Sequence, residues 1–369
     1  MKKIYTSNPQ SEFERIGSEI EACVLKVLRG GKYILGNELE EFEKSFSEYI
    51  GTKFGIGVAN GTDAIEIALR ALNIGSNDEV ITVSHTAIPT VAAIVASGAK
   101  PVLIDVEKEF YTIDPNKIRE NITDKTKAVI AVHLYGQPCN MQEIKKICDE
   151  SNIKLIEDVS QAHGASYFDK KLGSFGSIAC FSCYPTKNLG ALGDAGVLVT
   201  NNADLAEKCK MIRQYGWNKS ASSEIFGRNS RLDEIQAAIL NIKLKYLDSH
   251  NEMRNYIANK YTENLCNLPI KIPMVRKNST HVFHLYVIQV EKRDLLMRFL
   301  NKYDIYPGIH YPYPVHKQKT YKELAFFNDL DYTEYLSKRI ISLPIYPGLK
   351  IENVNYICSK LEEFYKISS

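Results

Sequence analysis

Short apolar runs alternate with helix-like stretches between residues 51 and 201. The apolar runs lie at residues 54–58, 80–83, 102–104, 128–132, 155–156, 178–181 and 197–200. In the intervening stretches 64–72, 90–96 and 141–150, apolar residues recur every three or four positions. Strands that alternate with helices form a mainly parallel sheet flanked by helices. The pattern predicts an α/β fold whose ligands bind beyond the carboxyl ends of the strands.

The pattern changes after residue 231. One helical face continues to residue 246, a long polar helix follows, and Pro269 and Pro273 interrupt the periodicity. Residues 281–290 then resemble a strand and residues 294–300 a short helix. We therefore predict a large domain over residues 1–250, with an N-terminal helical segment, and a small C-terminal α+β domain over residues 251–369.

Composition favours a small-molecule ligand over a polymer or a membrane. The chain has a net charge of +2 and is 44% apolar, so no overall field would hold nucleic acid or an anionic lipid surface. The most apolar stretch, 80–106, is interrupted by His85, Pro89 and Asp105, and the N-terminus has no apolar leader. We expect a cytoplasmic protein without a membrane span.

Cysteine spacing does not predict a metal site. The eight cysteines show no disulfide rhythm, and Cys180 and Cys183 form the only C-x-x-C pair. That pair lies in an apolar strand-like run, where a three-residue separation places side chains on opposite faces. We expect small core residues here and no metal.

A candidate anion site follows the first predicted strand, at Asn60-Gly61-Thr62-Asp63. The strand leads through glycine into a helix N-terminus, where free N–H groups and the helix dipole attract anions. Asn60 or Thr62 could equally be a plain helix cap. Asn60 also stands where a dinucleotide fingerprint beginning at Gly55 requires glycine, which disfavours a nicotinamide enzyme.

Polar residues also follow the strand at 155–156. A buried acid such as Asp158 requires a cationic partner, and a protonated pyridine nitrogen is one candidate. Gln161 could contact the ring hydroxyl of such a cofactor, and His163 could support Asp158 from behind. Asp158 could instead be a helix cap and His163 a structural histidine.

The most informative lysine is Lys187, in the run Phe181-Ser-Cys-Tyr-Pro-Thr-Lys187-Asn-Leu-Gly-Ala-Leu-Gly-Asp-Ala-Gly196. It follows an apolar strand, with Ser182 five residues before it and three glycines after it. A lysine that forms a Schiff base needs a lowered pKa so that the free amine is nucleophilic near neutral pH. Ser182 could donate to a phosphate, and the glycines permit a close backbone approach.

These motifs resemble the DegT/DnrJ/EryC1/StrS aminotransferases. The resemblance rests on residues 184–194, on Glu157-Asp158, and on residues 229–238, and it extends over nearly the whole chain from Gly36. It implies fold type I of the pyridoxal-phosphate enzymes, like aspartate aminotransferase, with the cofactor alternating between pyridoxal and pyridoxamine phosphate. Some relatives carry histidine in place of the lysine and act as dehydrases; Lys187 argues against that chemistry.

The resemblance also implies individual roles. Lys187 would be the Schiff-base lysine, Asp158 the partner of the pyridine nitrogen and Gln161 a contact of the ring hydroxyl. The phosphate would be held by Gly61, Thr62 and Ser182, and by Asn229 from a second subunit. That role of Asn229 implies a homodimer with shared active sites.

One position departs from the family pattern. Many relatives carry an aromatic residue over the cofactor ring two positions after the site of His85, where this chain has Ala87. His85 could supply the stacking instead, or it could simply line the pocket.

The segment from residue 308 to 321 resembles the members that aminate C3 of dTDP-linked 3-keto-6-deoxyhexoses. The implied reaction takes its amino group from L-glutamate and supplies surface-glycan biosynthesis. Clustered polar aromatics on a loop are suited to a sugar ring, although the same residues could merely pack a proline-stiffened loop. We expect substrate contacts from Tyr184, His310, Tyr311 and His316.

Two rival functions remain open at this point. A 4-aminotransferase acting on a UDP- or GDP-linked 4-keto sugar would share every cofactor residue, and a non-catalytic regulatory protein could use the same fold. The carboxylate of glutamate could be bound by an arginine fork from Arg213, Arg228 or Arg231.

Overall fold

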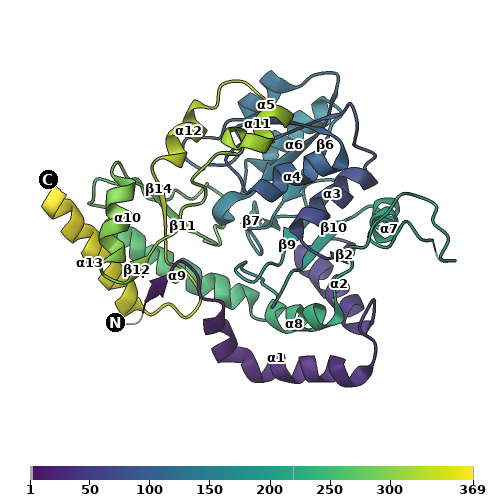
Figure 1. The fold of residues 1–369 in the computed structure, drawn as a ribbon, viewed down its shortest axis with the longest axis horizontal. Helices are drawn as coiled ribbons and strands as arrows, with labels where there is room; N and C mark the ends of the chain where they lie inside the picture. The colour runs from purple at the N-terminus through teal and green to yellow at the C-terminus, as the bar shows by residue number, and fades with distance from the viewer. Residues whose placement is uncertain (1–2, 219, 369) are drawn as a thin grey trace.

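An eight-stranded sheet forms the centre of the protein in the computed structural model, which describes residues 3–218 and 220–368 (Figure 1). Its strand order is β13 (Phe326–Phe327), β4 (Lys100–Ile104), β3 (Glu79–Val83), β5 (Thr126–Val132), β6 (Lys154–Asp158), β9 (Ile178–Ser182), β10 (Gly196–Thr200) and β2 (Phe54–Val58). Neighbouring strands are parallel except where β10 pairs with β9 and β2. The mainly parallel α/β fold predicted from the apolar runs is confirmed.

Helices connect these strands and bury them. The crossover and flanking helices are α3 (Gly61–Ala71), α4 (Ile88–Ser97), α5 (Pro115–Asn121), α6 (Met141–Glu150) and α7 (Ala203–Ile212). The N-terminal helices α1 (Gln10–Gly30) and α2 (Asn37–Ile50) both pack on α8 (Glu234–Leu244). Because helices cover the sheet, the strands are buried along almost their whole length, which explains their continuous apolar character.

A smaller unit with its own apolar core lies at one side of the sheet (Figure 1). It contains the antiparallel pair β11 (Tyr286–Gln289) and β14 (Ile340–Leu343), together with helices α9 (Leu247–Leu265), α10 (Arg293–Asn301) and α13 (Ile351–Ser368). Shorter elements join them: β12 (Ile305–Tyr306), η2 (Val315–Lys317), α11 (Lys319–Leu324) and α12 (Asp331–Ser337).

Two short strands cross the domain boundary that the sequence predicts. β1 (Ile4–Tyr5) pairs with β12 of the small unit, whereas β13 pairs with β4 of the central sheet. The predicted boundary at residue 250 also falls inside α9. Strands of two residues carry no periodicity, so the sequence pattern does not reveal such exchanges.

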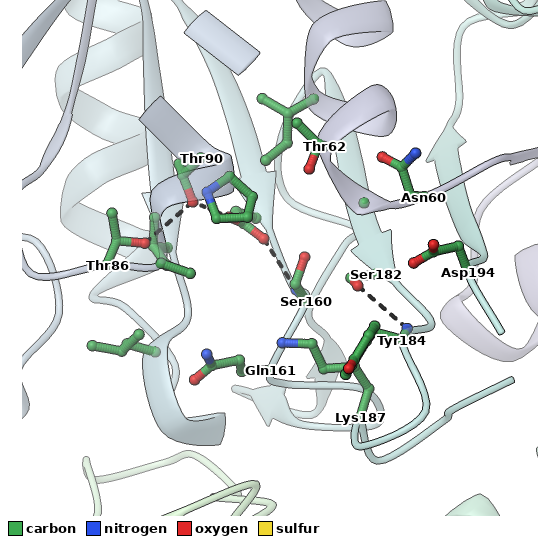
Figure 2. A pocket seen from close by; sticks show the side chains of 17 residues that line it. Asn60, Thr62, Thr86, Thr90, Ser160, Gln161, Ser182, Tyr184, Lys187 and Asp194 are labelled. Carbon is green, nitrogen blue, oxygen red and sulfur yellow. Dashed lines mark hydrogen bonds between the residues drawn. The ribbon is translucent and has the colours of Figure 1, made fainter. Parts of the chain in front are cut away.

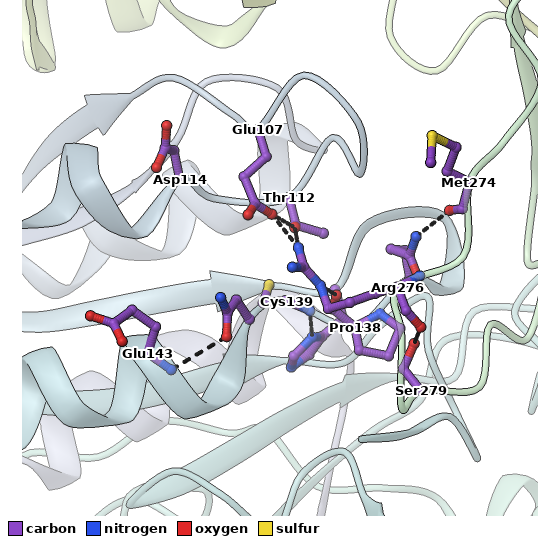
Figure 3. A network of polar contacts seen from close by, with 12 residues as sticks. Glu107, Thr112, Asp114, Pro138, Cys139, Glu143, Met274, Arg276 and Ser279 are labelled. Carbon is purple, nitrogen blue, oxygen red and sulfur yellow. Dashed lines mark hydrogen bonds and ion pairs between the residues drawn. The ribbon is translucent and has the colours of Figure 1, made fainter. Parts of the chain in front are cut away.

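An arginine from the segment before β11 ties this segment to the large unit (Figure 3). Arg276 forms an ion pair with Glu107, and its Nε donates to the Pro138 carbonyl at 3.2 Å. Its guanidinium carbon lies 4.0 Å from the centre of the Phe110 ring. Burial raises the pKa of Glu107, and the positive charge of Arg276 opposes that rise. The contact links the chain that enters the small unit to the loop beyond β4.

The cysteine pair lies in the core, since Cys180 and Cys183 are both buried, and neither forms a disulfide. Across residues 3–218 and 220–368, no cluster of three or more His, Cys, Asp or Glu side chains is arranged to hold a metal ion. In the same described ranges, each helix is too short or too polar to cross a membrane.

Candidate active site

A cavity of about 250 Å³ opens beyond the carboxyl ends of β3, β6 and β9 (Figure 2). This volume is near the lower end of the ~300–1,000 Å³ range of small-molecule sites. It is lined by Asn60, Gly61, Thr62, Ile65, Thr86, Ala87, Pro89, Thr90, Val132, Leu134, Asp158, Ser160, Gln161, Ser182, Tyr184, Lys187 and Asp194. The structure therefore brings together seven of the predicted site residues, from the ends of the three strands β2, β6 and β9: Gly61, Thr62, Asp158, Gln161, Ser182, Tyr184 and Lys187.

Lys187 extends into this cavity from the loop after β9 (Figure 2). Its backbone N–H donates to the Tyr184 carbonyl at 2.8 Å, and Cys183 and Ala195 close the loop with a hydrogen bond of the same length. Burial lowers the pKa of Lys187 to about 8, although the charge of Asp158 acts in the opposite direction. A useful fraction of the amine is therefore neutral and nucleophilic near physiological pH.

Asp158 ends strand β6 and is only 4% exposed. Its Oδ2 accepts a hydrogen bond from Thr90 Oγ1 at 2.8 Å, and its Oδ1 accepts one from the Ser160 N–H at 3.1 Å. Both hydrogen bonds fix the orientation of the carboxyl group, which is the group that would pair with a protonated pyridine nitrogen. Sequence reasoning missed Thr90, although it lies in the helix directly after β3, at the same edge of the sheet.

The opposite end of the cavity suits a phosphate. The side chain of Asn60 caps α3 by accepting from the Asp63 N–H at 2.8 Å, which leaves the first N–H groups of the helix directed outward. A Cβ atom at Gly61 would lie 2.5 Å from the Cβ of Ser182, so only glycine lets this hydroxyl lie against the helix start. A helix N-terminus beside Thr62 and Ser182 is a donor set for a phosphate dianion.

Gln161 has a defined amide orientation. Its Oε1 accepts from the backbone N–H of Tyr135 at 2.8 Å, so its Nε2 must be the group that donates to Tyr311 Oη at 2.9 Å. Burial raises the pKa of Tyr311 to about 12, and this phenol keeps its proton near neutral pH. These residues fit pyridoxal phosphate: a carboxylate for the ring nitrogen, an amide for the ring oxygen, a lysine for the aldehyde and donors for the phosphate.

The four residues expected to contact substrate occupy different environments. Tyr184 lines the cavity and is 52% exposed. Tyr311 reaches the cavity wall through Gln161, and His310 beside it bonds Ser342 Oγ through Nδ1 at 2.8 Å. Burial and the nearby charge of Lys187 lower the pKa of His310 to about 4, so this ring is neutral at pH 7.

His316, in contrast, lies away from the cavity. Its ring is 2% exposed and is bonded to Ser84 Oγ at 2.7 Å and to Glu334 at 3.1 Å. The expected substrate contact is therefore replaced by a buried structural network. The polar-aromatic pattern of the loop does not reveal which of its histidines is buried in a hydrogen-bond network away from the cavity.

His85 does not line the cavity either. It is 2% exposed, and its Nε2 lies 2.7 Å from Tyr135 Oη. Thr86 and Ala87 line the cavity in its place. The ring is thus held behind the wall, and the expected stacking over a cofactor is not seen in this arrangement.

The remaining candidates lie outside the cavity of their own chain. Asn229 is exposed and bridges to Gln214. Arg213 pairs with Glu43, and Arg228 pairs with Glu66 at 2.6 Å and with Asp63 at 3.3 Å. The buried Nε of Arg231 has no hydrogen-bond partner within the described part of the chain, but Arg231 does not line the cavity.

Sequence comparisons identify close relatives of the whole chain. The chain is 46% identical over 350 residues to the dTDP-3-amino-3,6-dideoxy-alpha-D-galactopyranose transaminase of Aneurinibacillus thermoaerophilus (95% of this chain, 96% of the relative). It is 40% identical to a pleiotropic regulatory protein of Geobacillus stearothermophilus (96% of each). It is 41% identical to the dTDP-3-amino-3,4,6-trideoxy-alpha-D-glucose transaminase of Streptomyces venezuelae (92% and 90%).

Solved structures agree with these relatives. The fold matches S. venezuelae DesV in complex with a ketimine intermediate, with a TM-score of 0.96, 39% identity and 99% of each chain covered. It also matches NtdA from Bacillus subtilis with bound cofactor PMP, with a TM-score of 0.93 and 33% identity (99% of this chain, 86% of the other). The sequence model of the DegT/DnrJ/EryC1/StrS aminotransferase family matches residues 14–362. The chain belongs to this family and is a pyridoxal-phosphate-dependent sugar aminotransferase.

Proposed function

We propose that the chain transfers the amino group of L-glutamate to C3 of a dTDP-linked 3-keto-6-deoxyhexose. The product would be a dTDP-3-amino-3,6-dideoxyhexose, made in the cytoplasm for surface glycans. The observation that carries the chemistry is Lys187, a lysine with a pKa of about 8 that enters the cavity together with Asp158. The 46% identical relative, a transaminase named for a dTDP-3-amino-3,6-dideoxyhexose, supports the choice of sugar.

Each residue of the cavity is proposed to have a different role in the reaction. When bound, pyridoxal phosphate supplies an electron sink for the bonds broken at the amino-bearing carbon. Asp158, held by Thr90 and Ser160, would pair with the ring nitrogen. Lys187 Nζ acts first as the nucleophile and then, once free, carries the proton to and from the substrate carbon. Helix α3 and Ser182 would hold the phosphate.

The sugar ring is proposed to lie toward Tyr184, His310 and Tyr311. Tyr184 offers an exposed aromatic face at the mouth of the cavity, and Tyr311 offers a protonated phenol beside Gln161. His310 is neutral, so it can exchange a hydrogen bond with a sugar hydroxyl without bringing a second positive charge close to Lys187.

A silent regulatory role is the less favoured alternative, suggested by the name of one relative. A protein that only bound a ligand would not need a nucleophilic lysine, a buried carboxylate and a phosphate cradle in one cavity. A 4-aminotransferase would use the same cofactor residues, so substrate tests must separate it from a 3-aminotransferase.

The decisive experiment combines reconstitution with substrate choice. Purified protein is loaded with pyridoxal phosphate and incubated with L-glutamate and one of two isomeric substrates, dTDP-3-keto-6-deoxyglucose or dTDP-4-keto-6-deoxyglucose. We expect a yellow protein that aminates the 3-keto sugar. Lys187→Ala should abolish product formation, whereas Lys170→Ala, which changes an exposed lysine, should not. A colourless protein, or a Lys187→Ala variant that still aminates sugar, would falsify the proposed chemistry; exclusive use of the 4-keto isomer would overturn the regiochemistry.

We further propose that the active unit is a homodimer in which Asn229 reaches the phosphate of the other subunit. Asn229 is exposed and does not line the cavity of its own chain, and Phe226, three residues before it, is 80% exposed. Mixing Lys187→Ala with Asn229→Asp chains tests this arrangement, since each mixed dimer contains one site with both native residues. Activity that reappears on mixing supports a shared site. Mixed chains as inactive as the separate variants contradict it.

A further inference from the structure

Tyr135 adopts an unusual backbone conformation behind the cavity wall. It lies in the short helix η1 (Leu134–Gly136) just after β5, with φ of 63° and ψ of 0°. This left-handed region is unfavourable for a bulky side chain and persists only where surrounding contacts hold it. Tyr135 is 3% exposed and does not line the cavity, yet both its backbone and its hydroxyl bond residues of the site.

The backbone of Tyr135 determines the orientation of Gln161. The Tyr135 N–H donates to Gln161 Oε1 at 2.8 Å, so the amide oxygen is already hydrogen-bonded to the backbone. Only the amide nitrogen then remains for Tyr311 Oη, at 2.9 Å, and for a ligand in the cavity. A rotated amide would place its NH₂ against the Tyr135 N–H, donor against donor, so the left-handed turn at Tyr135 selects one of two amide states.

The hydroxyl of Tyr135 binds the neighbouring loop. It has one proton, which goes to the backbone carbonyl oxygen of His310, a group that can only accept. His85 Nε2, 2.7 Å from the same hydroxyl, must therefore be the donor of that pair. Burial keeps the His85 ring neutral, with a pKa lowered to about 4, so this ring carries its single proton on Nε2.

We propose that Tyr135 is a positioning residue that couples the Gln161 amide to the His310–Tyr311 segment. This inference rests on the function proposed above and extends it to a residue that touches neither cofactor nor sugar. Gln161 lines the cavity and Tyr311 is one of the proposed sugar contacts. Their side chains bond each other although they lie 150 residues apart. Loss of the Tyr135 hydroxyl removes one of the bonds that hold the loop, while the bond to Ser342 and the bond of the Gln161 amide remain. We therefore expect the sugar half-reaction to be affected and the glutamate half-reaction to be unchanged.

Tyr135→Phe is the sharpest test, because it removes the hydroxyl and keeps the backbone N–H bond to Gln161. For the loss of one net hydrogen bond, we expect the KM for the keto sugar to rise about three- to tenfold. The rate and KM of the glutamate half-reaction should change less than about twofold.

Tyr111→Phe provides a matched control. Tyr111 is also buried with a positive φ, at 60°, and its ring centre lies 6.3 Å from that of Tyr135. Its hydroxyl bonds Gln289 instead of the site. Tyr111→Phe should have a thermal stability similar to that of Tyr135→Phe. Its KM values for the keto sugar and for glutamate should equal those of the wild type.

A second measurement is independent of turnover. Hydrogen–deuterium exchange of peptides from residues 308–315, in cofactor-free protein, should be faster in Tyr135→Phe and unchanged in Tyr111→Phe. If exchange is unchanged in Tyr135→Phe, the proposal that the Tyr135 hydroxyl anchors the loop is wrong. If the variant affects the kinetics of both half-reactions equally, Tyr135 has only a general structural role. If the wild type aminates no keto sugar, the proposed function fails, and the exchange comparison still decides whether Tyr135 anchors the loop.

Discussion

The two ends of the active site are built in different ways. At the proposed cofactor end, the polar residues stand at strand ends, and several of their hydrogen bonds are local. Asn60 accepts from the Asp63 N–H three residues on, and Asp158 accepts from the Ser160 N–H two residues on as well as from the more distant Thr90. At the proposed sugar end, His310 and Tyr311 are held by Tyr135 and Gln161, from 175 and 150 residues away. The proposed cofactor contacts are thus attached to the sheet, whereas the proposed sugar contacts depend on how a loop packs.

If the cofactor end depends on single buried groups, Asp158→Asn should cause a large loss. The amide still accepts from Thr90 but no longer balances a protonated ring nitrogen. We expect kcat to fall on the order of 10²- to 10³-fold, as when one pre-organised electrostatic group is removed. Steady-state kinetics at saturating sugar measure this fall. Asp169→Asn, which alters an exposed turn, should retain full activity, and a loss below about fivefold for Asp158→Asn would contradict the role assigned to the carboxylate.

The lowered pKa of Lys187 predicts the pH dependence of cofactor capture. The neutral amine reacts and the protonated amine does not, so the rate should rise about tenfold per pH unit below pH 8 and level off above it. Asp158→Asn should move the midpoint to lower pH, because the charge of Asp158 raises the pKa of the lysine. Stopped-flow absorbance of apoprotein mixed with pyridoxal phosphate measures both midpoints. A midpoint near 10.5 would mean an ordinary solvated lysine.

The same shift affects stability. Between the folded pKa of about 8 and the ordinary value of 10.5, the unfolded chain binds more protons at this lysine than the folded chain. This group therefore adds stability to the apoprotein as pH rises through that window, and below pH 8 the cost of burying the charged amine is fully present.

At the sugar end we expect a smaller effect. Tyr311→Phe removes a phenol that stays protonated near neutral pH, so the KM for the keto sugar should rise about three- to tenfold with the glutamate half-reaction unchanged. Tyr313→Phe is the matched control, because Tyr313 lies two residues away and is 69% exposed. Separate measurement of the two half-reactions gives the comparison. Equal changes in both would show that Tyr311 acts on the cofactor end as well.

The smallest kinetic effect is expected at His316. His316→Gln should leave both KM values within about twofold, because the ring faces Ser84 and Glu334 instead of the cavity. Loss of buried hydrogen-bond partners should lower the free energy of unfolding by about 1–3 kcal/mol, measured by denaturant melts. Lys317→Gln removes an exposed partner of the same Glu334 and should cost less than about 1 kcal/mol. A selective rise in the sugar KM for His316→Gln would restore the substrate role first expected for it.

The strands of the central sheet and the polar residues at their ends could be predicted because the sequence patterns that mark them are local. All seven predicted apolar runs are strands of the central sheet, and Asp158 and Ser182 each end one of them. Sequence reasoning did not find β1, β13 or β14, which are two to four residues long, nor Thr90, whose importance comes from one hydrogen bond to Asp158. The sequence pattern also suggested that His85 contacts the cofactor and His316 the substrate. In the structure, both side chains are buried in hydrogen-bond networks.

The sequence by itself determined the order of the elements and the identity of the groups at each strand end. A parallel sheet gathers those ends at one edge, so Gly61, Asp158 and Lys187 could be placed together from spacing alone. Only the tertiary structure decided which polar aromatics face the cavity. The positions of His310, Tyr311 and His316 depend on which distant residue packs against each of them, and a local pattern contains no information about that partner.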